Sequence, residues 1–294
     1  MNRDNEAVRY LKRSLVASLL VTGLLCVPAK GTAQNITMTD GGSTATINPG
    51  NGTGNLGMNN WSVLNQNQLA QQWFWYSVNG AAAQPINNIG GMTHNLNGLN
   101  DLTLGYANGQ LSVNIEYVLS GNGTGSGSAD LQEYITVLNT GSQSLNLTFY
   151  QYSNFNLLGN NQNSVHIAGI PFNAGDPFSG YTGAQQTTGG PGGNGLAEVI
   201  DAPYANYAEA ALLGQTLGNL NGPSYYTLND NTTAGPGDVT WAFQWNTDPL
   251  APGASLNITK DKGLSIQIVP EPTTFAFIAL GGSALGLVFR RKMF

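Results

Sequence analysis

The sequence predicts an all-β protein whose main part is a β-sandwich ectodomain with long Gly/Pro-rich loops. Three observations favour this fold class: many short segments alternate apolar and polar residues, turn-forming Gly, Asn and Pro separate them, and few segments favour a helix. No repeat of fixed period is present, which disfavours propellers and solenoids. Strands of this kind each have an apolar face to bury, so two packed sheets are expected.

The first half of the ectodomain supplies most of the predicted strands. Residues 41–57 are rich in Gly, Asn and Thr and predict a loose region or short strands with turns. Residues 71–78 are densely aromatic and predict a strand buried on both faces. Period-2 alternation then predicts a β-meander. Its strands are residues 111–117, 131–138 and 144–152, separated by a loop at 121–128 and a turn at 139–142.

The second half is expected to contain long loops between fewer strands. Residues 169–195 and 219–237 are rich in Gly and Pro and predict surface loops. Ala, Glu and Leu in residues 205–215 favour a short helix between them. Aromatic alternation in residues 238–246 predicts a strand, and residues 256–268 predict one or two more.

Charge and cysteine content exclude several classes of protein. The chain has 10 Lys and Arg against 16 Asp and Glu, a net charge of −6. Between residues 34 and 270 the only basic residues are Lys260 and Lys262, so a nucleic-acid partner is excluded. The single cysteine is Cys26, so the ectodomain has no disulfides and its stability depends on a packed core.

The N-terminus has the pattern of an export signal. Arg9, Lys12 and Arg13 precede an apolar run over residues 15–27, and residues 31–33 are a small-residue cleavage site. We expect a signal helix, export through the Sec translocon and cleavage by signal peptidase. The alternative is a retained N-terminal membrane anchor.

The C-terminus combines three elements in a fixed order. Pro270, Glu271 and Pro272 are followed by an uncharged apolar span at residues 273–289 and then by a basic end that begins with Arg290 and Arg291. The span is just long enough for a transmembrane helix, and the basic end is expected to stay cytoplasmic. The alternative is a buried C-terminal helix of the ectodomain.

This tail resembles the PEP-CTERM sorting signal of Gram-negative bacteria. The resemblance implies a sorting motif at Pro270, Glu271, Pro272, Arg290 and Arg291, recognised by a membrane processing enzyme of the exosortase type. It further implies an inner-membrane anchored precursor that is later delivered to the cell surface or extracellular matrix. The expected organisation is a signal peptide (1–33), a β-sandwich ectodomain (34–268) and a sorting signal (269–294).

Catalytic motifs are not evident in the ectodomain. Its two histidines, His94 and His166, lie in separate segments, and no Gly-x-Ser-x-Gly motif is present. Two isolated histidines without cysteine do not make a zinc site. We therefore expect no enzyme and no cofactor, with both histidines solvated or satisfied within the structure.

One pair of acidic residues is a candidate for calcium or for acid–base catalysis. If the hairpin loop at residues 121–128 is symmetric, Glu116 faces Glu133, and opposed carboxylates favour a cation or a shared proton. Such a pair suits Ca²⁺ or glycoside hydrolysis. The alternative is two solvent-facing glutamates on neighbouring strands.

Aromatic residues offer a possible surface for glycans. Trp73 with Trp75, and Trp241 with Trp245, are two or four residues apart and therefore share a strand face. Their alternative role is to fill the core. Tyr225 and Tyr226, in a loop, are the better exposed candidates for glycan contact.

These observations lead to three functional hypotheses. The first is a non-enzymatic surface or matrix protein associated with exopolysaccharide and biofilm. The second is a carbohydrate-binding module for matrix glycans, which requires exposed aromatic side chains. The third is a polysaccharide-active enzyme, which requires two carboxylates in one cleft.

Overall fold

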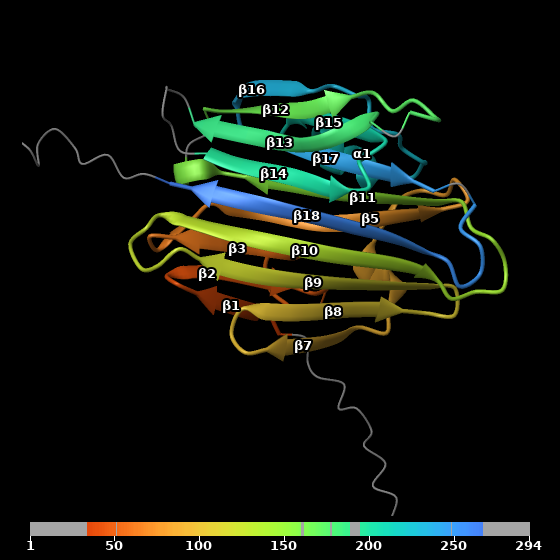
Figure 1. The fold of residues 1–294 in the computed structure, drawn as a ribbon, viewed down its shortest axis with the longest axis horizontal. Helices are drawn as coiled ribbons and strands as arrows, with labels where there is room; N and C mark the ends of the chain where they lie inside the picture. The colour runs from red at the N-terminus through yellow and green to blue at the C-terminus, as the bar shows by residue number, and fades with distance from the viewer. Residues whose placement is uncertain are drawn as a thin grey trace, which may run out of the picture. The chain divides into compact units, whose positions relative to one another are not determined.

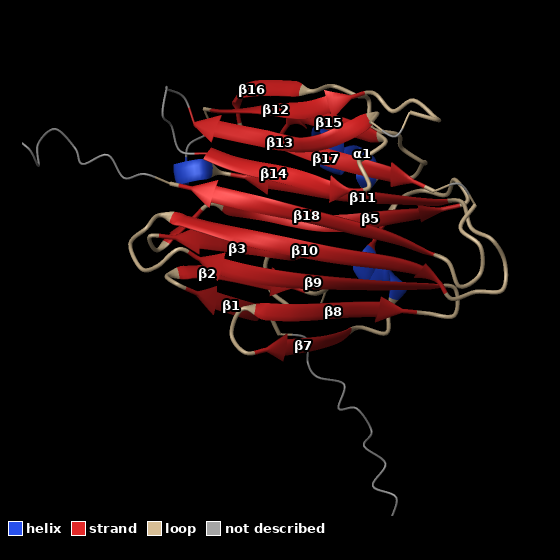
Figure 2. Ribbon diagram, in the orientation of Figure 1, coloured by secondary structure: helices blue, strands red, loops and turns tan. Residues whose placement is uncertain are grey.

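Two antiparallel β-sheets that lie face to face make up the ectodomain (Figures 1 and 2). The computed structural model describes residues 34–50, 52–159, 162–176, 178–188, 195–247 and 249–266. The predicted β-sandwich is therefore confirmed. The expected signal helix and transmembrane helix lie outside the described residues.

The first sheet, sheet A, has nine strands in the order β1-β2-β3-β5-β11-β17-β15, with β4 beside β3 and β6 beside β5. Its strands are β1 (Ile36–Asp40), β2 (Ser43–Asn48), β3 (Gly57–Val63), β4 (Gln66–Asn67), β5 (Leu69–Val78), β6 (Gln84–Pro85), β11 (Leu147–Phe155), β15 (Tyr207–Leu212) and β17 (Val239–Asn246). Two helical segments accompany it: the 3₁₀ helix η1 (Ile86–Ile89) and the helix α1 (Gln215–Leu220).

The second sheet, sheet B, also has nine strands, in the order β16-β12-β13-β14-β18-β10-β9-β8-β7. Its strands are β7 (Thr93–Asn97), β8 (Asp101–Ala107), β9 (Leu111–Gly121), β10 (Ser128–Asn139), β12 (Asn163–Ile170), β13 (Gly180–Thr188), β14 (Gly195–Ala202), β16 (Thr233–Gly237) and β18 (Ser255–Ser265). A short 3₁₀ segment, η2 (Leu157–Gly159), lies between β11 and β12. Sheet B forms the front layer in Figure 1.

The core lies between the sheets and follows from strand periodicity. In β9, Leu111, Val113, Ile115, Tyr117 and Leu119 are buried, whereas the residues between them are exposed or half-buried. Strand β10 alternates in the same way, and the two strands pair in register along their length. The inner face of sheet B is thus apolar over its centre, and burial of this face stabilises the sandwich.

The outer faces of the two sheets differ in their covering. On sheet A, the Trp75 indole donates a hydrogen bond to Asn221 Oδ1 (3.1 Å), which lies just after α1. The Trp73 indole donates to Asn87 Oδ1 in η1 (3.4 Å). Every residue of β11 is buried, and the segment after β15 covers part of this strand, since the Tyr150 hydroxyl donates to the carbonyl oxygen of Tyr226. The outer residues of β9, β10 and β14, in contrast, are exposed or half-buried, so sheet B offers the more open face.

Several predicted elements are confirmed and several are wrong. Strands predicted at 71–78, 111–117 and 131–138 lie within β5, β9 and β10, and the strand predicted at 238–246 agrees with β17 to within one residue. The β-meander is wrong in its third strand, because β11 belongs to sheet A while β9 and β10 belong to sheet B. The helix predicted at 205–215 is wrong: its centre is β15, buried against β17, so tertiary packing overrides the helix propensity of Ala and Leu.

The long loop predicted at residues 169–195 is also wrong. Strand β13 occupies its middle, paired on one side with β12 and on the other with β14. Gly and Pro near its ends concealed a strand of nine residues.

The described part of the chain contains no helix of the length and apolarity needed to span a membrane.

Candidate functional site

The predicted pairing of Glu116 with Glu133 is wrong by one position. Glu116 lies opposite Tyr134, and Glu133 lies opposite Tyr117. A shift of one residue sends a side chain to the other face of a strand, so Glu116 is exposed while Glu133 is fully buried between the sheets. No group of three or more His, Cys, Asp or Glu side chains in the described ranges is arranged to hold a metal ion.

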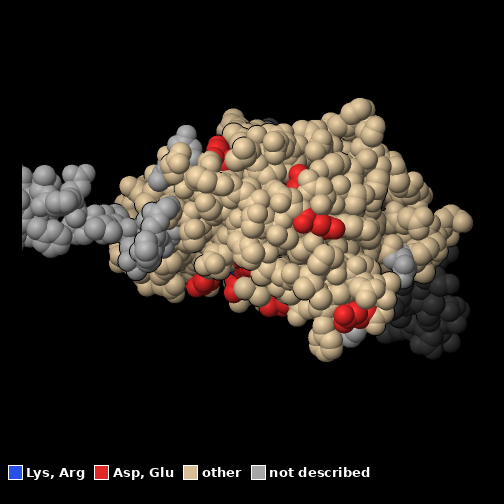
Figure 3. Space-filling view, turned by 90° about the horizontal axis from the view of Figure 1, so that it is seen from above, with Lys and Arg blue, Asp and Glu red and all other residues tan. Residues whose placement is uncertain are grey.

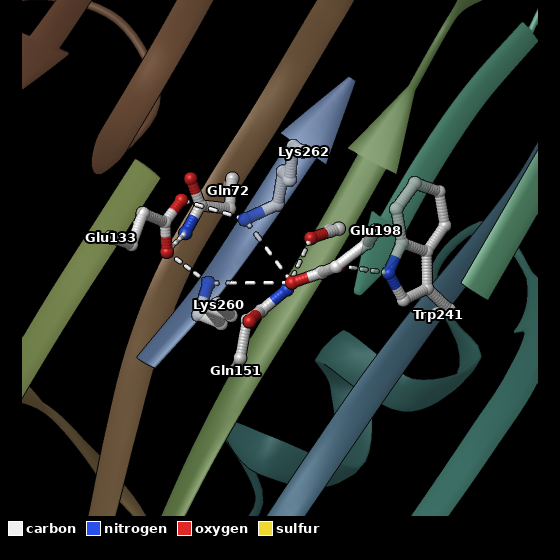
Figure 4. Close-up of polar contacts among 8 residues, drawn as sticks. Gln72, Glu133, Gln151, Glu198, Trp241, Lys260 and Lys262 are labelled. Atoms are coloured by element: carbon white, nitrogen blue, oxygen red, sulfur yellow. Dashed lines mark hydrogen bonds and ion pairs between the residues drawn. The ribbon is translucent and has the colours of Figure 1, made fainter. Parts of the chain in front are cut away.

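Glu133 instead belongs to a buried ionic cluster of four residues (Figure 4). Two lysines of β18, Lys260 and Lys262, lie between Glu133 of β10 and Glu198 of β14. Lys262 Nζ lies 2.6 Å from Glu133 Oε1 and 3.2 Å from Glu198 Oε1. Lys260 Nζ forms an ion pair with Glu133 and lies 3.3 Å from Glu198 Oε1. All four side chains are fully buried, and their formal charges cancel.

Polar side chains of sheet A complete the surroundings of this ionic cluster. Glu198 Oε2 accepts hydrogen bonds from the Trp241 indole (2.7 Å) and from Gln151 Nε2 (2.9 Å). Gln72 Nε2 donates to Glu133 Oε2 (3.3 Å), and Lys260 Nζ lies 5.2 Å from the centre of the Phe74 ring. The cluster therefore joins β5, β11 and β17 of sheet A to β10, β14 and β18 of sheet B.

Neighbouring charges set the protonation of the ionic cluster. Burial by itself raises the pKa of the Glu198 carboxyl, but Lys262, Lys260 and the donors Trp241 and Gln151 outweigh burial and lower that pKa to about 2. Burial likewise lowers the pKa of Lys262, but the carboxylates of Glu133 and Glu198 outweigh it and raise that pKa. Both groups stay charged at neutral pH, and a fully enclosed, charge-balanced cluster of this kind can fix strand pairing but cannot contact a substrate.

The tryptophans considered for glycan binding are core residues. Trp73, Trp75, Trp241 and Trp245 are all buried. Trp75 packs edge-on against Tyr152, and Trp241 stacks on Phe155. A sugar therefore has no access to these rings.

Tyr225 and Tyr226 lie beside sheet A rather than on the open face of sheet B. Tyr226 donates a short hydrogen bond to the buried Glu209, which also accepts from Thr216 Oγ1 (2.6 Å). The Tyr225 hydroxyl lies 3.3 Å from Thr148 Oγ1. Burial, then the bond to Glu209, raise the pKa of Tyr226 to about 12. Both hydroxyls are thus engaged within the protein, and Tyr226 fixes the segment that follows α1.

The two histidines lie near opposite edges of sheet B. His94 is exposed on the edge strand β7. His166 is exposed on β12, where it lies opposite Gln185 of β13. His166 also lines an open pocket.

An open pocket of about 500 Å³ lies on the outer side of β12, β13 and β14, and we call it the main pocket. Its floor is made of small residues, and larger polar or apolar side chains surround them. The lining residues are His166, Ala168, Thr182, Gly183, Ala184, Gln185, Ala197, Glu198, Val199, Ile200, Asp201 and Tyr204. Of the acids, Asp201 is exposed, whereas the Glu198 side chain points into the ionic cluster. A Cβ on Gly183 would lie 2.1 Å from the backbone oxygen of Glu198, so only glycine fits there.

Two β-bulges aim side chains at the main pocket. Between β12 and β13, the register passes from Ala168 opposite Gly183 to Gly169 opposite Tyr181, which leaves Thr182 as the extra residue. Between β14 and β18, it passes from Ile200 opposite Lys260 to Ala202 opposite Thr259, which leaves Asp201 as the extra residue. Both extra residues line the pocket. Bulges are frequent beside active sites because they redirect a side chain.

Tyr204 is held in place by the backbone around it. The Ala205 backbone exchanges two hydrogen bonds with Tyr181 (2.8 and 3.0 Å). The Trp245 indole donates to the carbonyl of Pro203 (2.9 Å). The residues before and after Tyr204 are therefore anchored to different sheets, which holds the backbone of Tyr204 at the pocket.

A second depression, of about 320 Å³, adjoins the main pocket, and we call it the aromatic hollow. It shares Asp201 and Tyr204 with the main pocket and adds two exposed phenylalanines, Phe172 and Phe178. The remaining lining residues are Asp176, Ser179, Ala202 and Pro203. Ser179 Oγ lies 2.8 Å from the carbonyl oxygen of Asp176, a hydrogen bond that closes the loop before β13. Asp201 and Tyr204 thus lie where the two hollows adjoin.

The outer face of sheet B is acidic next to these hollows. Asp261 of β18 lies opposite Val199, and Asp130 lies opposite Gly263 on the same strand. Burial, with the charges of Asp130 and Asp201, raises the pKa of Asp261. Figure 3 views the molecule from above Figure 1, onto the edge of the sandwich near β16 and β12, and shows Asp and Glu but no Lys or Arg there. Both lysines of the described ranges are in the ionic cluster.

Sequence reasoning missed this site for a physical reason. His166, Asp201 and Tyr204 come from strands and a loop that become neighbours only when β12, β13 and β14 pair. No contiguous motif marks them. The one local signal is Pro203, which follows the last residue of β14, Ala202, and directly precedes Tyr204.

Comparison with known proteins gives a fold and a sorting signal. The sequence matches none of the curated proteins with which it was compared. A candidate aldose 1-epimerase of Escherichia coli K12 is similar in structure, with a TM-score of 0.50, 10% identity, and coverage of 80% of this chain and 99% of that one. A bacterial glucoamylase solved with acarbose is similar at a TM-score of 0.52 and 8% identity, over 85% of this chain and 35% of that one. The chain thus spans about a third of the glucoamylase.

The expectation that the ectodomain is a non-enzymatic matrix protein is contradicted by these likenesses. The same fold occurs in a bacterial glucoamylase and in a candidate aldose 1-epimerase. The expectation rested on the missing sequence motif. Such a motif is absent by nature where residues from separate strands line one pocket.

The tail is identified independently of the fold. The family model described as the PEP-CTERM protein-sorting motif matches residues 269–292, which include the Pro270–Pro272 motif and the basic end. The motif implies an exported, membrane-anchored precursor and processing by exosortase. The chain therefore carries a PEP-CTERM sorting motif, which follows a two-sheet β-sandwich in the sequence.

Proposed function

We propose that the ectodomain binds a saccharide in the main pocket and converts it by acid–base chemistry. One observation carries the proposal: His166, Asp201 and Tyr204 line a single open pocket of about 500 Å³. That volume is in the range of small-molecule sites. The pocket provides two titratable groups and an aromatic ring beside a floor of small residues.

The two titratable groups suit the interconversion of sugar anomers. The Asp201 carboxylate accepts the proton of the anomeric hydroxyl, and the His166 imidazolium donates a proton to the ring oxygen. The bond between the anomeric carbon and the ring oxygen breaks, and an open-chain aldehyde forms. Rotation of the aldehyde and return of both protons close the ring as the other anomer.

The rest of the pocket suits recognition of a sugar. Thr182 and Gln185 supply a hydroxyl and an amide for sugar hydroxyl groups. Tyr204 and Val199 supply apolar surface for the carbon face of the ring. The fold shared with a candidate aldose 1-epimerase over 99% of that chain supports the proposal.

The proposal extends to where the protein works. The N-terminal segment directs export, the exosortase removes the tail, and the ectodomain acts at the cell surface within reach of extracellular polysaccharide. Mass spectrometry of the mature protein tests this part. A C-terminus before residue 273 is expected, whereas a mature chain that ends at Phe294 contradicts removal of the tail.

The catalytic part is tested by polarimetry on freshly dissolved α-D-glucose and α-D-galactose. Conversion of either sugar above the rate in buffer is expected for the unaltered protein, with at least a roughly hundredfold loss in His166→Gln and Asp201→Asn. His94→Gln is the matched control, because His94 is also exposed but lies on the edge strand at the far side of the same sheet. If calorimetry shows that the sugar binds but polarimetry shows no conversion, the site is a binding site and the acid–base roles of His166 and Asp201 are refuted. Equal rates in the His166 and His94 variants would have the same consequence.

A further inference from the structure

We infer that the substrate of this site is a chain of sugars without acidic groups, with one sugar in the main pocket and the next in the aromatic hollow. The inference rests on the proposed function and names its substrate class. The first support is geometric. Asp201 and Tyr204 line both hollows, so a molecule that fills the main pocket lies directly beside the aromatic hollow.

The second support is the exposure of the aromatic rings. Phe178 is 81% exposed and Phe172 is 47% exposed, although both lie beside a fixed pocket. Both phenylalanines lie between β12 and β13 and outside the buried core, whereas most large aromatic side chains on the strands of sheets A and B are buried. Exposed rings beside a polar site bind the apolar faces of ligands, and a sugar ring has such a face.

The third support is charge. The aromatic hollow contains Asp176 and Asp201. His166 is the one basic side chain that lines either hollow among the described residues, since Lys260 and Lys262 are enclosed between the sheets. A uronate or sulfated sugar in the aromatic hollow would face carboxylates without a compensating cation, which disfavours binding. A neutral sugar meets no such repulsion.

Calorimetry with the full-length, detergent-solubilised protein tests the inference. The probes are glucose, maltotriose, cellotriose and trigalacturonate. At least one neutral trisaccharide is expected to bind roughly tenfold more tightly than glucose, because a second ring is stacked and its apolar surface is buried. Trigalacturonate is expected to bind more weakly than either neutral trisaccharide.

The variant Phe178→Ala is expected to reduce trisaccharide affinity to that of glucose while glucose affinity is unchanged. Tyr134→Ala is the matched control, because Tyr134 is 42% exposed on the same sheet but borders neither hollow. Retention of the trisaccharide advantage in Phe178→Ala overturns the inference, as does equal binding of trigalacturonate. If glucose binds and no trisaccharide binds more tightly, this inference alone fails. If neither glucose nor any trisaccharide binds, the proposed function fails with it.

Discussion

Thr182 and Asp201 are the extra residues of two β-bulges, on β13 and β14, and both side chains line the main pocket. In a strand without a bulge, successive side chains alternate between the core and the outer face, and a bulge interrupts this alternation. The two irregularities therefore occur where the outer face of sheet B is hollowed. This coincidence is the structural basis for assigning function to this end of the sheet.

Filling the main pocket is predicted to block saccharide binding without unfolding the domain. Ala197 is exposed on its floor, so Ala197→Phe occupies the pocket volume and buries nothing new. Calorimetry is expected to show loss of binding, while the free energy of unfolding changes by less than about 0.5 kcal/mol. Ala107→Phe, at an exposed position on β8 away from the pocket, is expected to bind normally. Normal binding by Ala197→Phe would place the saccharide elsewhere.

Removing one charge of the ionic cluster is predicted to destabilise the protein strongly. Glu133→Gln leaves Lys260 and Lys262 with Glu198 as their one remaining carboxylate, and breaking a buried ion pair costs about 3–5 kcal/mol. Glu116→Gln, on the exposed face of the adjacent strand, is expected to change stability by less than about 0.5 kcal/mol. Urea denaturation measures both. Similar losses in the two variants would contradict the buried position of Glu133.

Acid is predicted to weaken the fold through Glu198. Its pKa falls from the ordinary 4.5 to about 2 on folding, so the folded state holds this proton less tightly than the unfolded state. The corresponding stability, about 3 kcal/mol in full, is present above about pH 4.5 and is lost as the pH falls toward 2. Urea unfolding between pH 5 and pH 3 is expected to show a steeper loss in the unaltered protein than in Glu198→Gln. Parallel losses would mean that Glu198 is not held ionised by the lysines.

Substitutions of Tyr226 and Tyr225 are predicted to differ in their effect on the stability of the protein and to leave sugar binding unchanged. Tyr226→Phe removes a donor from the buried carboxylate of Glu209 and is expected to cost about 1–3 kcal/mol. Tyr225→Phe removes a longer contact with Thr148 and is expected to cost less than about 1 kcal/mol. Thermal unfolding of both variants tests the difference. Loss of saccharide affinity in either variant would instead support the interpretation of these tyrosines as glycan contacts.

The sequence predicted the elements whose signal is local. Alternation of large apolar residues identified β9, β10 and β17, and the tail was recognisable because its three elements are contiguous. Register was not predictable, because the hairpin loop between β9 and β10 is offset by one residue from symmetry. Because of this offset, Glu116 and Glu133 do not face each other: the Glu116 side chain is exposed and the Glu133 side chain is buried.

The candidate site was not predictable for a different reason. Strands β12, β13 and β14 carry small and polar residues, so their alternation is weak, and Gly-rich segments flank β13. Their pairing depends on β18 and on the ionic cluster, which are distant in the sequence. Bulge positions such as Asp201 depend on that pairing and have no local signature.

Hydroxyl-radical footprinting of the full-length protein with a saturating neutral trisaccharide tests most directly where the ligand binds. Tyr204 is 36% exposed at the junction of the two hollows, and Tyr225 is similarly exposed beside sheet A. Protection of Tyr204 and Phe178 with no change at Tyr225 is the expected result. Protection of Tyr225, or an unaltered rate at Tyr204 under saturation, would contradict a saccharide site on the outer face of sheet B.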